Sequence, residues 1–280
     1  MTVSLQGKWA LITGASSGLG IDFAHLLGQR GCNLILVARR MPQLEKVCKD
    51  ISAQYGVQAI PIPCDLSIPN APNELHKTIL EKNLQVDVLI NNAGFGNFGN
   101  FVGIPWEKEQ QLIMVNVMAM TQLTKLFLKE MVHRNEGYIL LVASLASAAP
   151  SPTLATYAAS KSYIRSLGEA LNFELRKTKV KLTVACPGYT ATDFFRANEM
   201  KTQPLLFKLT LMKSRTVARS SINAMIRGQP FVVTGLLNKM SDLLVRFVPR
   251  RIAVVMAYLF LLQEKPHQGG LPVLAPEQED

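Results

Sequence analysis

Short apolar runs alternate with amphipathic stretches along most of this 280-residue chain. Each run is rich in Val, Ile and Leu and is apolar on both faces, a pattern typical of parallel strands that helices cover on both sides. The predicted strands are WALIT (9–13), NLILVA (33–38), AIPIP (59–63), VDVLIN (86–91), YILLVAS (138–144), KLTVAC (181–186) and FVVTG (231–235).

The stretches between these runs are predicted helices. The first runs from Gly18 to Arg30 and is followed by Gly31 at a C-cap position, and longer ones cover about 106–133 and 155–178. This alternation predicts an α/β fold of the Rossmann type, with a doubly wound parallel sheet of about seven strands flanked by helices. No linker composition or internal repeat interrupts it, so we expect a single domain over 1–235 and an extension over 236–280.

The chain carries a net charge of +10 and has a sequence pI near 9.5. Such an excess is compatible with nucleic acid, an anionic membrane surface or an acidic small molecule as partner. The basic residues are scattered and are not interleaved with aromatic residues, which argues against nucleic acid. A solvated basic surface accounts for most of them.

The four cysteines, Cys32, Cys48, Cys64 and Cys186, show no CxxC spacing and no His/Cys metal pattern. We expect free thiols in a reducing, cytoplasmic compartment and no metal site. The N-terminal apolar stretch leads into a glycine-rich turn without a cleavage site, so a signal peptide is not expected. No run of 18 apolar residues predicts a spanning helix.

The segment TGASSGLG (13–20) follows the first predicted strand and opens the first predicted helix. Glycines at 14, 18 and 20 allow a tight turn and the close approach of a pyrophosphate, while the helix N-terminus supplies free N–H groups. In this context the GxxxGxG spacing predicts a dinucleotide site. The residues predicted to form it are Gly14, Ser16, Ser17, Gly18, Leu19 and Gly20.

The second strand ends in LILVARR, which places Ala38 where NAD-binding folds carry a ribose-binding carboxylate. Arg39 and Arg40 follow, and guanidinium groups can bind a 2′-phosphate that a carboxylate would repel. We therefore expect NADP(H) in preference to NAD(H), with NAD(H) as the alternative.

Tyr157 and Lys161 lie four residues apart in ATYAASKSYI (155–164), so a helix would place both on one face. A free tyrosine has a pKa near 10, and a lysine ammonium one turn away favours the phenolate. If the pair is functional, Lys161 would lower the pKa of Tyr157 and make it a usable acid; the alternative is a pair without a function. Alone, the spacing also arises by chance.

With these features in place, the chain resembles the short-chain dehydrogenase/reductase family over roughly residues 5–235. The further motifs, in the family's order and spacing, are CDL (64–66), NNAG (91–94), Asn116 in VNVMA, Ser144 in LVAS, YAASK (157–161) and PGYTAT (187–192). NNAGFGNFGNF, LVARR and CPGYTATDFF are most similar to the bacterial group often labelled DltE-like or ketoacyl-reductase-like. Ser17 departs from the family pattern, because many NADP-preferring members carry a basic residue there.

The resemblance implies four catalytic residues. Tyr157 would protonate a carbonyl oxygen as hydride arrives from the nicotinamide, and Ser144 would stabilise the developing oxyanion. Lys161 would also bind the nicotinamide ribose, and Asn116 would hold a water that relays protons to it. The implied activity is hydride transfer between NADP(H) and a carbonyl or secondary alcohol.

The resemblance also implies the remaining cofactor contacts. They are Asp65 and Leu66 at the adenine, Asn91, Ala93 and Gly94 at the adenosine, and Pro187, Gly188, Thr190 and Thr192 towards the carboxamide. A segment at about 189–229 would close over the substrate. Its apolar residues are compatible with a ketoacyl chain, a steroid-like ketone or an aromatic ketone, and equally with packing on the domain; they are Phe194, Phe195, Leu205, Leu206, Phe207, Leu209, Leu211 and Met212.

Residues 236–262 combine apolar residues with four cations and contain Pro249. They would suit an amphipathic helix pair on an anionic membrane. They would also suit a cover for the sheet edge or for a subunit neighbour, which we favour. By resemblance, the helices at about 106–133 and 155–178 would pair subunits into a homodimer or homotetramer.

A second hypothesis is a non-catalytic dinucleotide-binding sensor or interaction protein on the same scaffold, because fold does not fix function. The intact set of Asn116, Ser144, Tyr157 and Lys161 favours the enzyme.

Overall fold

The computed structural model describes residues 4–191 and 211–262. Its main sheet consists of β1 Trp9–Thr13, β2 Asn33–Ala38, β3 Ala59–Pro63, β4 Val86–Asn91, β5 Tyr138–Val142, β6 Lys181–Cys186 and β9 Phe231–Val233. The order is β3-β2-β1-β4-β5-β6-β9, and all neighbours run parallel. The predicted parallel sheet of seven strands is confirmed; β5 and β9 end earlier than predicted, and the other bounds match.

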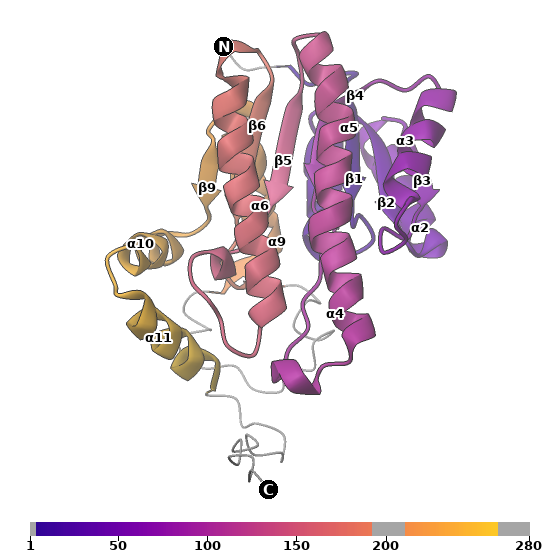
Figure 1. Cartoon of the computed structure of the whole chain (residues 1–280). Helices are drawn as coiled ribbons and strands as arrows, with labels where there is room; N and C mark the ends of the chain where they lie inside the picture. The colour runs from indigo at the N-terminus through magenta and orange to yellow at the C-terminus, as the bar shows by residue number, and fades with distance from the viewer. Residues whose placement is uncertain (1–3, 192–210, 263–280) are drawn as a thin grey trace, which may run out of the picture.

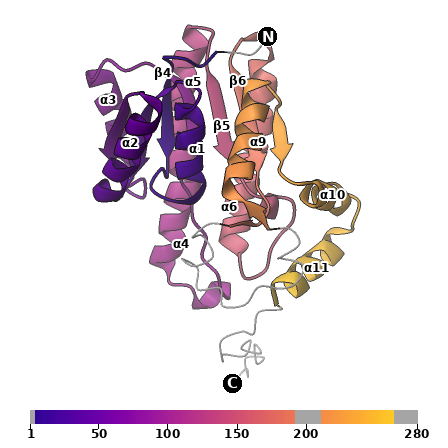
Figure 2. The same ribbon diagram turned by 180° about the vertical axis from the view of Figure 1, so that it is seen from behind.

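Helices cover both faces of this sheet (Figures 1 and 2). One face carries α1 Gly18–Gly28, α2 Met41–Tyr55 and α9 Ser214–Ile226, and the other carries α3 Ala71–Glu81, α5 Met120–His133 and α6 Ala155–Glu174. Successive strand residues therefore enter different cores: Ile12 of β1 packs on the α1 side and Leu11 on the α5 side. This double burial explains why the strands are apolar on both faces.

The chain order around β1 creates the place for a ligand. β1 pairs with β2 on one side and with β4 on the other, and the chain runs outward to β3 before it returns to β4. Open α/β sheets bind ligands outside the carboxyl ends of the strands at such a switch point. The fold therefore predicts a ligand site at the loops after β1 and β4.

The helix predicted over 106–133 is interrupted. It consists of α4 Trp106–Ile113, a π-helical turn η2 Met114–Ala119, and α5. By length and composition alone this stretch could cross a membrane. However, its residues Leu112, Leu123 and Phe127 are buried in the core, as in a helix that packs on a sheet.

The chain after the sheet continues as two helices. α10 Leu236–Val245 and α11 Arg250–Leu262 project from the body below the strand ends (Figure 1). Pro249 directly precedes α11, as expected for a broken helix pair. The division of the chain at residue 235 stays a prediction. The shorter elements are η1 Phe101–Gly103, η3 Leu145–Ser147, η4 Leu175–Lys177 and a parallel pair, β7 Thr190–Ala191 with β8 Met212–Lys213.

The cysteines are free thiols, as predicted. Cys32, Cys48 and Cys186 are buried among apolar side chains. Burial raises the pKa of Cys32 to about 12 and that of Cys48 and Cys186 to about 11. These thiols therefore stay protonated and unreactive near neutral pH.

Candidate active site

The glycine turn after β1 packs tightly against the loop after β4. Gly14 and Gly18 have φ values of +68° and +51°. A Cβ on Gly14 would lie 2.9 Å from Asn92 Nδ2 and 3.0 Å from Ala93 Cα, and a Cβ on Gly20 would lie 2.1 Å from the Gly14 carbonyl oxygen. Only glycine fits these positions, and the resulting turn leads into the N-terminus of α1.

The loop after β4 is tied to β1 by Asn92, which the sequence analysis did not select. Asn92 Nδ2 donates to the Thr13 carbonyl at 2.9 Å, and the Asn92 and Ala93 backbone N–H groups donate to Thr13 Oγ1 at 3.0 Å. Asn91 points the other way: its Nδ2 donates to Thr124 Oγ1 at 3.0 Å inside the fold. Neighbouring strand residues face opposite sides of a sheet, so the sequence indicates that Asn91 and Asn92 cannot both face the cavity.

A cavity of about 1510 Å³ lies at the carboxyl ends of the strands. The predicted residues that line it are Gly14, Ser16, Ser17, Gly18, Leu19, Arg39, Arg40, Asp65, Leu66, Ala93, Gly94, Ser144, Tyr157, Lys161, Pro187, Gly188 and Thr190. Three predicted residues, Gly20, Asn91 and Asn116, are absent from this lining. Thr192 lies outside the described residues.

One end of the cavity is rimmed by Arg39 and Arg40, both exposed. Asp65 lies nearby, and its Oδ1 accepts hydrogen bonds from Ser67 N at 3.0 Å and Ser67 Oγ at 2.7 Å. Burial acts to raise the pKa of Asp65, but these bonds and the charge of Arg39 outweigh it and lower the pKa. Asp65 is therefore a carboxylate at neutral pH, held beside a guanidinium.

Asn116 lies on the π-helical turn between α4 and α5 and is fully buried. Its Oδ1 accepts from Phe95 N at 3.1 Å, and its Nδ2 donates to Phe95 O at 2.9 Å and Ser160 Oγ at 3.1 Å. A Cβ on Gly94 would lie 3.0 Å from both Asn116 Oδ1 and Lys161 Nζ. Asn116 thus lies behind the cavity wall and supports it; π-turns of this kind often occur at functional sites.

Ser144, Tyr157 and Lys161 line the same cavity and lie close together. Tyr157 and Lys161 lie one turn apart on α6, as predicted, with Lys161 Nζ 5.8 Å from the centre of the Tyr157 ring. Ser144 follows β5 and is hydrogen-bonded to Tyr157. Lys161 Nζ also donates to the Val142 carbonyl at 2.9 Å. The fold therefore brings the hydroxyl, the phenol and the ammonium into one place.

Burial dominates the titration of this group. It raises the pKa of Tyr157 to about 12, although the hydrogen bond with Ser144 acts in the opposite direction. It lowers the pKa of Lys161 to about 8. The predicted lowering of the Tyr157 pKa by Lys161 is therefore wrong for this structure, because both groups are desolvated and desolvation disfavours each charged form.

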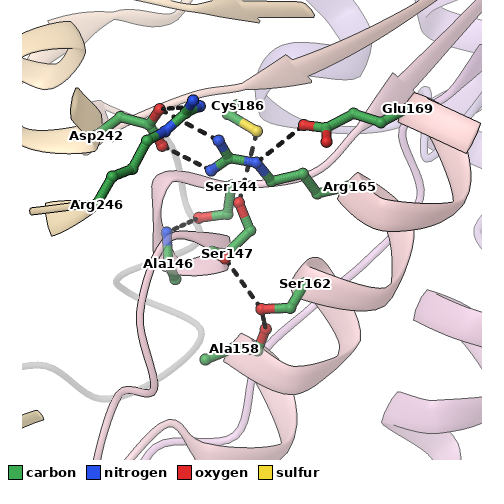
Figure 3. A network of polar contacts seen from close by, with 10 residues as sticks. All are labelled: Ser144, Ala146, Ser147, Ala158, Ser162, Arg165, Glu169, Cys186, Asp242 and Arg246. Atoms are coloured by element: carbon green, nitrogen blue, oxygen red, sulfur yellow. Dashed lines mark hydrogen bonds and ion pairs between the residues drawn. The ribbon is translucent and has the colours of Figure 1, made fainter. Parts of the chain in front are cut away.

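The turn that carries Ser144 is fixed by a polar network (Figure 3). Ser144 Oγ accepts from Ala146 N at 3.2 Å, and Ser162 Oγ of α6 donates to the Ser147 carbonyl at 3.1 Å. Ser147 Oγ and Cys186 Sγ lie 3.6 Å apart. The strand end, the 3₁₀ turn and α6 thus hold Ser144 in place from both sides.

The far side of the cavity is built by α10 and α11, which the sequence analysis did not assign to the site. The lining residues from these helices and their connection are Leu237, Asn238, Met240, Ser241, Leu244, Val245, Val248, Ala253, Met256 and Ala257. In the sequence, the only indication that these helices belong to the site was the apolar pattern of 236–262. Most of the predicted lid residues, from Phe194 to Leu209, lie outside the described residues; Leu211 directly precedes β8 and Met212 is in it. The last part of the predicted lid, Ser214–Ile226, is α9, which packs in the core on the α1 side of the sheet and does not line the cavity, so the prediction of a lid up to about 229 is wrong for this part.

Comparison with known proteins gives a consistent result. A family profile described as short chain dehydrogenase matches residues 8–203. The ketoacyl reductase HetN of Nostoc sp. is 32% identical over 221 residues, which cover 79% of this chain and 76% of that relative. The chain spans less of several insect and fungal relatives, with 59%, 61% and 51% of their length matched.

Solved structures share the fold. The short-chain dehydrogenase from Sphingobium yanoikuyae in complex with NADPH has a TM-score of 0.76 at 25% identity and covers 87% of this chain and 97% of its own. A short-chain dehydrogenase/reductase from Burkholderia phymatum in complex with NAD has a TM-score of 0.77 at 25% identity, with 86% and 94% covered. Both kinds of nicotinamide dinucleotide therefore occur among the structural neighbours.

Proposed function

Because the chain belongs to the short-chain dehydrogenase family, we propose that it is an NADP(H)-dependent oxidoreductase that interconverts a hydrophobic carbonyl compound and its secondary alcohol. Family membership supports the coarser part, an oxidoreductase that acts on CH–OH groups and uses a nicotinamide dinucleotide. The observation that carries the proposal is the meeting of Ser144, Tyr157 and Lys161 in one cavity with the glycine turn.

The residues present fit a dinucleotide. The space beside the turn is one that a Cβ on Gly14 would invade, and the N-terminus of α1 supplies backbone donors for a pyrophosphate. Lys161 and Gly94 would lie beside the nicotinamide half, and Asp65 beside the adenine half. Arg39 and Arg40 offer two guanidinium groups and no carboxylate stands at Ala38, which favours a 2′-phosphate and hence NADP(H).

The three central side chains divide the proton chemistry. When bound, the nicotinamide supplies or accepts the hydride at the substrate carbon. Ser144 Oγ donates a hydrogen bond to the carbonyl oxygen and stabilises its developing charge. Tyr157 Oη then gives its proton to that oxygen; with a pKa of about 12 the phenol is fully protonated at neutral pH, and an alkoxide is the stronger base. Lys161 stabilises the phenolate that remains.

The substrate proposal rests on the side of the cavity opposite the glycine turn. Leu237, Met240, Leu244, Val248 and Met256 give this side an apolar surface suited to a ketoacyl chain, a steroid-like ketone or an aromatic ketone. The name of the Nostoc relative, a ketoacyl reductase, favours the first of these.

We further propose a cytoplasmic homodimer or homotetramer. Exposed apolar side chains on the two long helices support pairing there: Met118 on η2 and Phe173 on α6 are 54% and 66% exposed. Cells keep most of their NADP(H) in the reduced form, NADPH. This excess of NADPH would favour the direction of carbonyl reduction.

The test is the consumption of NADPH and of NADH, side by side, with a carbonyl panel that runs from small polar ketones to ketoacyl thioesters and steroids. We expect turnover with NADPH on the hydrophobic members, and a loss of about 10²- to 10⁴-fold in Tyr157→Phe. The matched control is Tyr163→Phe, because Tyr163 lies on the same helix and its hydroxyl contacts Thr121. Dinucleotide binding without turnover of any carbonyl would overturn the proposal in favour of a sensor.

A further inference from the structure

Helix α10 buries polar residues and exposes apolar ones, which is the reverse of an ordinary surface helix. Its polar residues Asn238 and Asp242 face the domain and are only 2% and 5% exposed. Its apolar residues Leu236, Leu243 and Leu244 face outward and are 75%, 54% and 59% exposed. A helix at a protein–water boundary shows the opposite arrangement, with its apolar stripe against the core.

This orientation is fixed by specific bonds. Asp242 forms an ion pair with Arg165, with the carboxylate oxygens 2.6 and 3.2 Å from the guanidinium nitrogens (Figure 3). Asn238 Nδ2 donates to the Thr234 carbonyl at 2.8 Å. Rotation of α10 to bury its leucines would break both contacts and leave the largely buried Arg165 with Glu169, which is 51% exposed, in place of its buried partner, so the leucines remain outside.

The exposed apolar surface continues through α11. Phe247 in the connection is 78% exposed, and Ile252, Val255 and Leu259 of α11 are 52%, 55% and 57% exposed. A contiguous apolar surface of this kind marks an interaction site rather than a face designed for water. We call the exposed apolar and basic residues of 236–259 the helix-pair face. They are Leu236, Leu237, Lys239, Met240, Leu243, Leu244, Arg246, Phe247, Arg250, Arg251, Ile252, Val255, Met256 and Leu259.

The helix-pair face is also positively charged. Lys239, Arg246, Arg250 and Arg251 are exposed. The acidic residue of 236–262, Asp242, is buried and forms ion pairs with both Arg165 and Arg246, and the Arg246 side chain remains 57% exposed. Apolar side chains interspersed with cations, with no exposed acid between them, are complementary to anionic lipid headgroups above acyl chains.

A second exposed apolar group lies on the other side of the cavity. Phe101 and Val102 of η1 and Trp106 at the start of α4 are 61%, 90% and 62% exposed. In both views α4 and α11 lie at the same end of the molecule, below the strand ends (Figures 1 and 2). Side chains of α4, α10 and α11 all line the cavity, which therefore lies between the two apolar groups.

We infer that the helix-pair face docks on the surface of an anionic lipid bilayer, with the tip of α4 as a second contact. A second copy of the chain is the less suitable occupant. In a two-fold dimer through this face the same patch meets itself, which would bring its four cations against four like cations.

This docking would place the cavity beside the lipid. Met240, Leu244 and Met256 contribute both to the helix-pair face and to the cavity lining. A hydrophobic carbonyl dissolved in the bilayer would then reach Tyr157 without crossing water. This substrate route rests on the proposed function, whereas the docking itself does not.

The first test is flotation of the full chain with vesicles of phosphatidylcholine containing 30% phosphatidylglycerol, and with vesicles of phosphatidylcholine alone. We expect binding to the anionic vesicles that weakens as salt is raised. Arg250→Gln/Arg251→Gln should lower the partition coefficient roughly 30-fold, at the usual contribution of a cation near such a surface. The control Lys177→Gln/Lys179→Gln removes two exposed charges from η4 and the loop that follows it, and this variant should bind normally.

The contribution of the apolar side chains to docking is tested with matched glutamate substitutions. Leu243→Glu on α10 should reduce binding about tenfold or more, whereas Leu80→Glu on α3, at 50% exposure, should not. Trp106 supplies a direct reporter, because its emission should shift to the blue on docking and the shift should vanish in Trp106→Phe.

Three results would overturn the inference. One is the absence of binding to anionic vesicles. Another is equal binding to neutral vesicles with no effect of the arginine substitutions. The third is a wild-type dimer, without vesicle binding, that Leu243→Glu converts to monomers in sedimentation equilibrium; a second copy would then be the occupant.

The substrate route needs its own readout. With an apolar ketone supplied in anionic vesicles, Leu243→Glu should lose turnover, and with a water-soluble carbonyl it should match the wild type. Vesicle binding without turnover of either carbonyl would contradict the proposed function and leave the docking intact. Equal turnover of both in Leu243→Glu would contradict the route alone.

Discussion

Arg165 of α6 holds both carboxylate oxygens of Asp242 of α10, at 2.6 and 3.2 Å (Figure 3). The two side chains are 13% and 6% exposed, and the guanidinium also lies 4.5 Å from the centre of the Phe231 ring. This pair joins the helix that carries Tyr157 and Lys161 to the helix that lines the opposite side of the cavity.

Removal of the Asp242 carboxylate should therefore affect stability and substrate binding together. Asp242→Ala leaves a largely buried guanidinium without its main partner, so we expect the free energy of unfolding to fall by about 3 kcal/mol in urea denaturation. The Michaelis constant for the substrate should rise, because α10 loses its attachment. Glu169→Ala is the control: Glu169 contacts the same Arg165 at 3.3 Å but is 51% exposed, and its loss should change stability by less than about 1 kcal/mol. Equal effects of the two substitutions would show that the buried pair has no special role.

The two arginines after β2 should determine the choice of dinucleotide. Arg39→Ala/Arg40→Ala should weaken NADPH binding about 10- to 100-fold, because each guanidinium lost is a charged hydrogen-bond donor to a phosphate, and leave NADH binding nearly unchanged. Fluorescence titration with both dinucleotides measures this. Arg215→Ala/Arg219→Ala removes the same charge from exposed positions on α9 and should change neither affinity. An equal loss for NADPH and NADH in the first variant would argue against a 2′-phosphate site.

The buried ammonium of Lys161 should make stability depend on pH in an unusual direction. Its pKa is about 8 in the folded protein against an ordinary 10.5. Between these values the unfolded chain binds more protons than the folded one, so this group makes stability rise as pH increases through the window. Tyr157, whose pKa rises from 10 to about 12, acts only above pH 10 and with the opposite sign.

Lys161→Met isolates this effect. Relative to wild type, the free energy of unfolding of the variant should fall by about 2 kcal/mol between pH 7 and pH 9.5, because the wild type gains stability over that range and the variant does not. Urea denaturation at the two pH values measures the difference. Lys125→Met removes an exposed ammonium from α5, and its effect should be the same at both pH values. A constant offset for Lys161→Met would mean that the ammonium is hydrated.

The glycine turn should not tolerate a methyl group at residue 20. A Cβ there would lie 2.1 Å from the Gly14 carbonyl oxygen, a backbone atom that can move only if the turn opens. Gly20→Ala should therefore weaken binding of either dinucleotide by at least tenfold and lower the melting temperature. Gly103→Ala adds the same methyl group where nothing lies within 4 Å, and should leave affinity unchanged. Normal dinucleotide affinity in Gly20→Ala would show that the turn is not part of the site.

The sheet and the positions of the glycine turn, Tyr157 and Lys161 at its strand ends could be predicted from sequence because their signals are local. Five of the strands end where the apolar runs end, since a strand buried on both faces cannot continue into polar residues. The spacing of Gly14, Gly18 and Gly20 reflects backbone conformations and close approaches that only glycine allows. Tyr157 and Lys161 share a helix face because the helix has 3.6 residues per turn.

What the tertiary structure decided depends on atoms that are distant in the chain. Alternation along the strand indicates that Asn91 and Asn92 face opposite sides, but only the packing of α5 against Asn91 shows that Asn92 is the one that lines the cavity. The pKa of Tyr157 rises because desolvation sums over every element packed around α6, whereas its spacing to Lys161 reports only one neighbour. The leucines of α10 face outward because Asp242 finds Arg165, 77 residues away in the sequence. The spacing of residues along a helix or strand can be read from the sequence, but the burial of a side chain and the choice of its ion-pair partner arise only when the chain has folded.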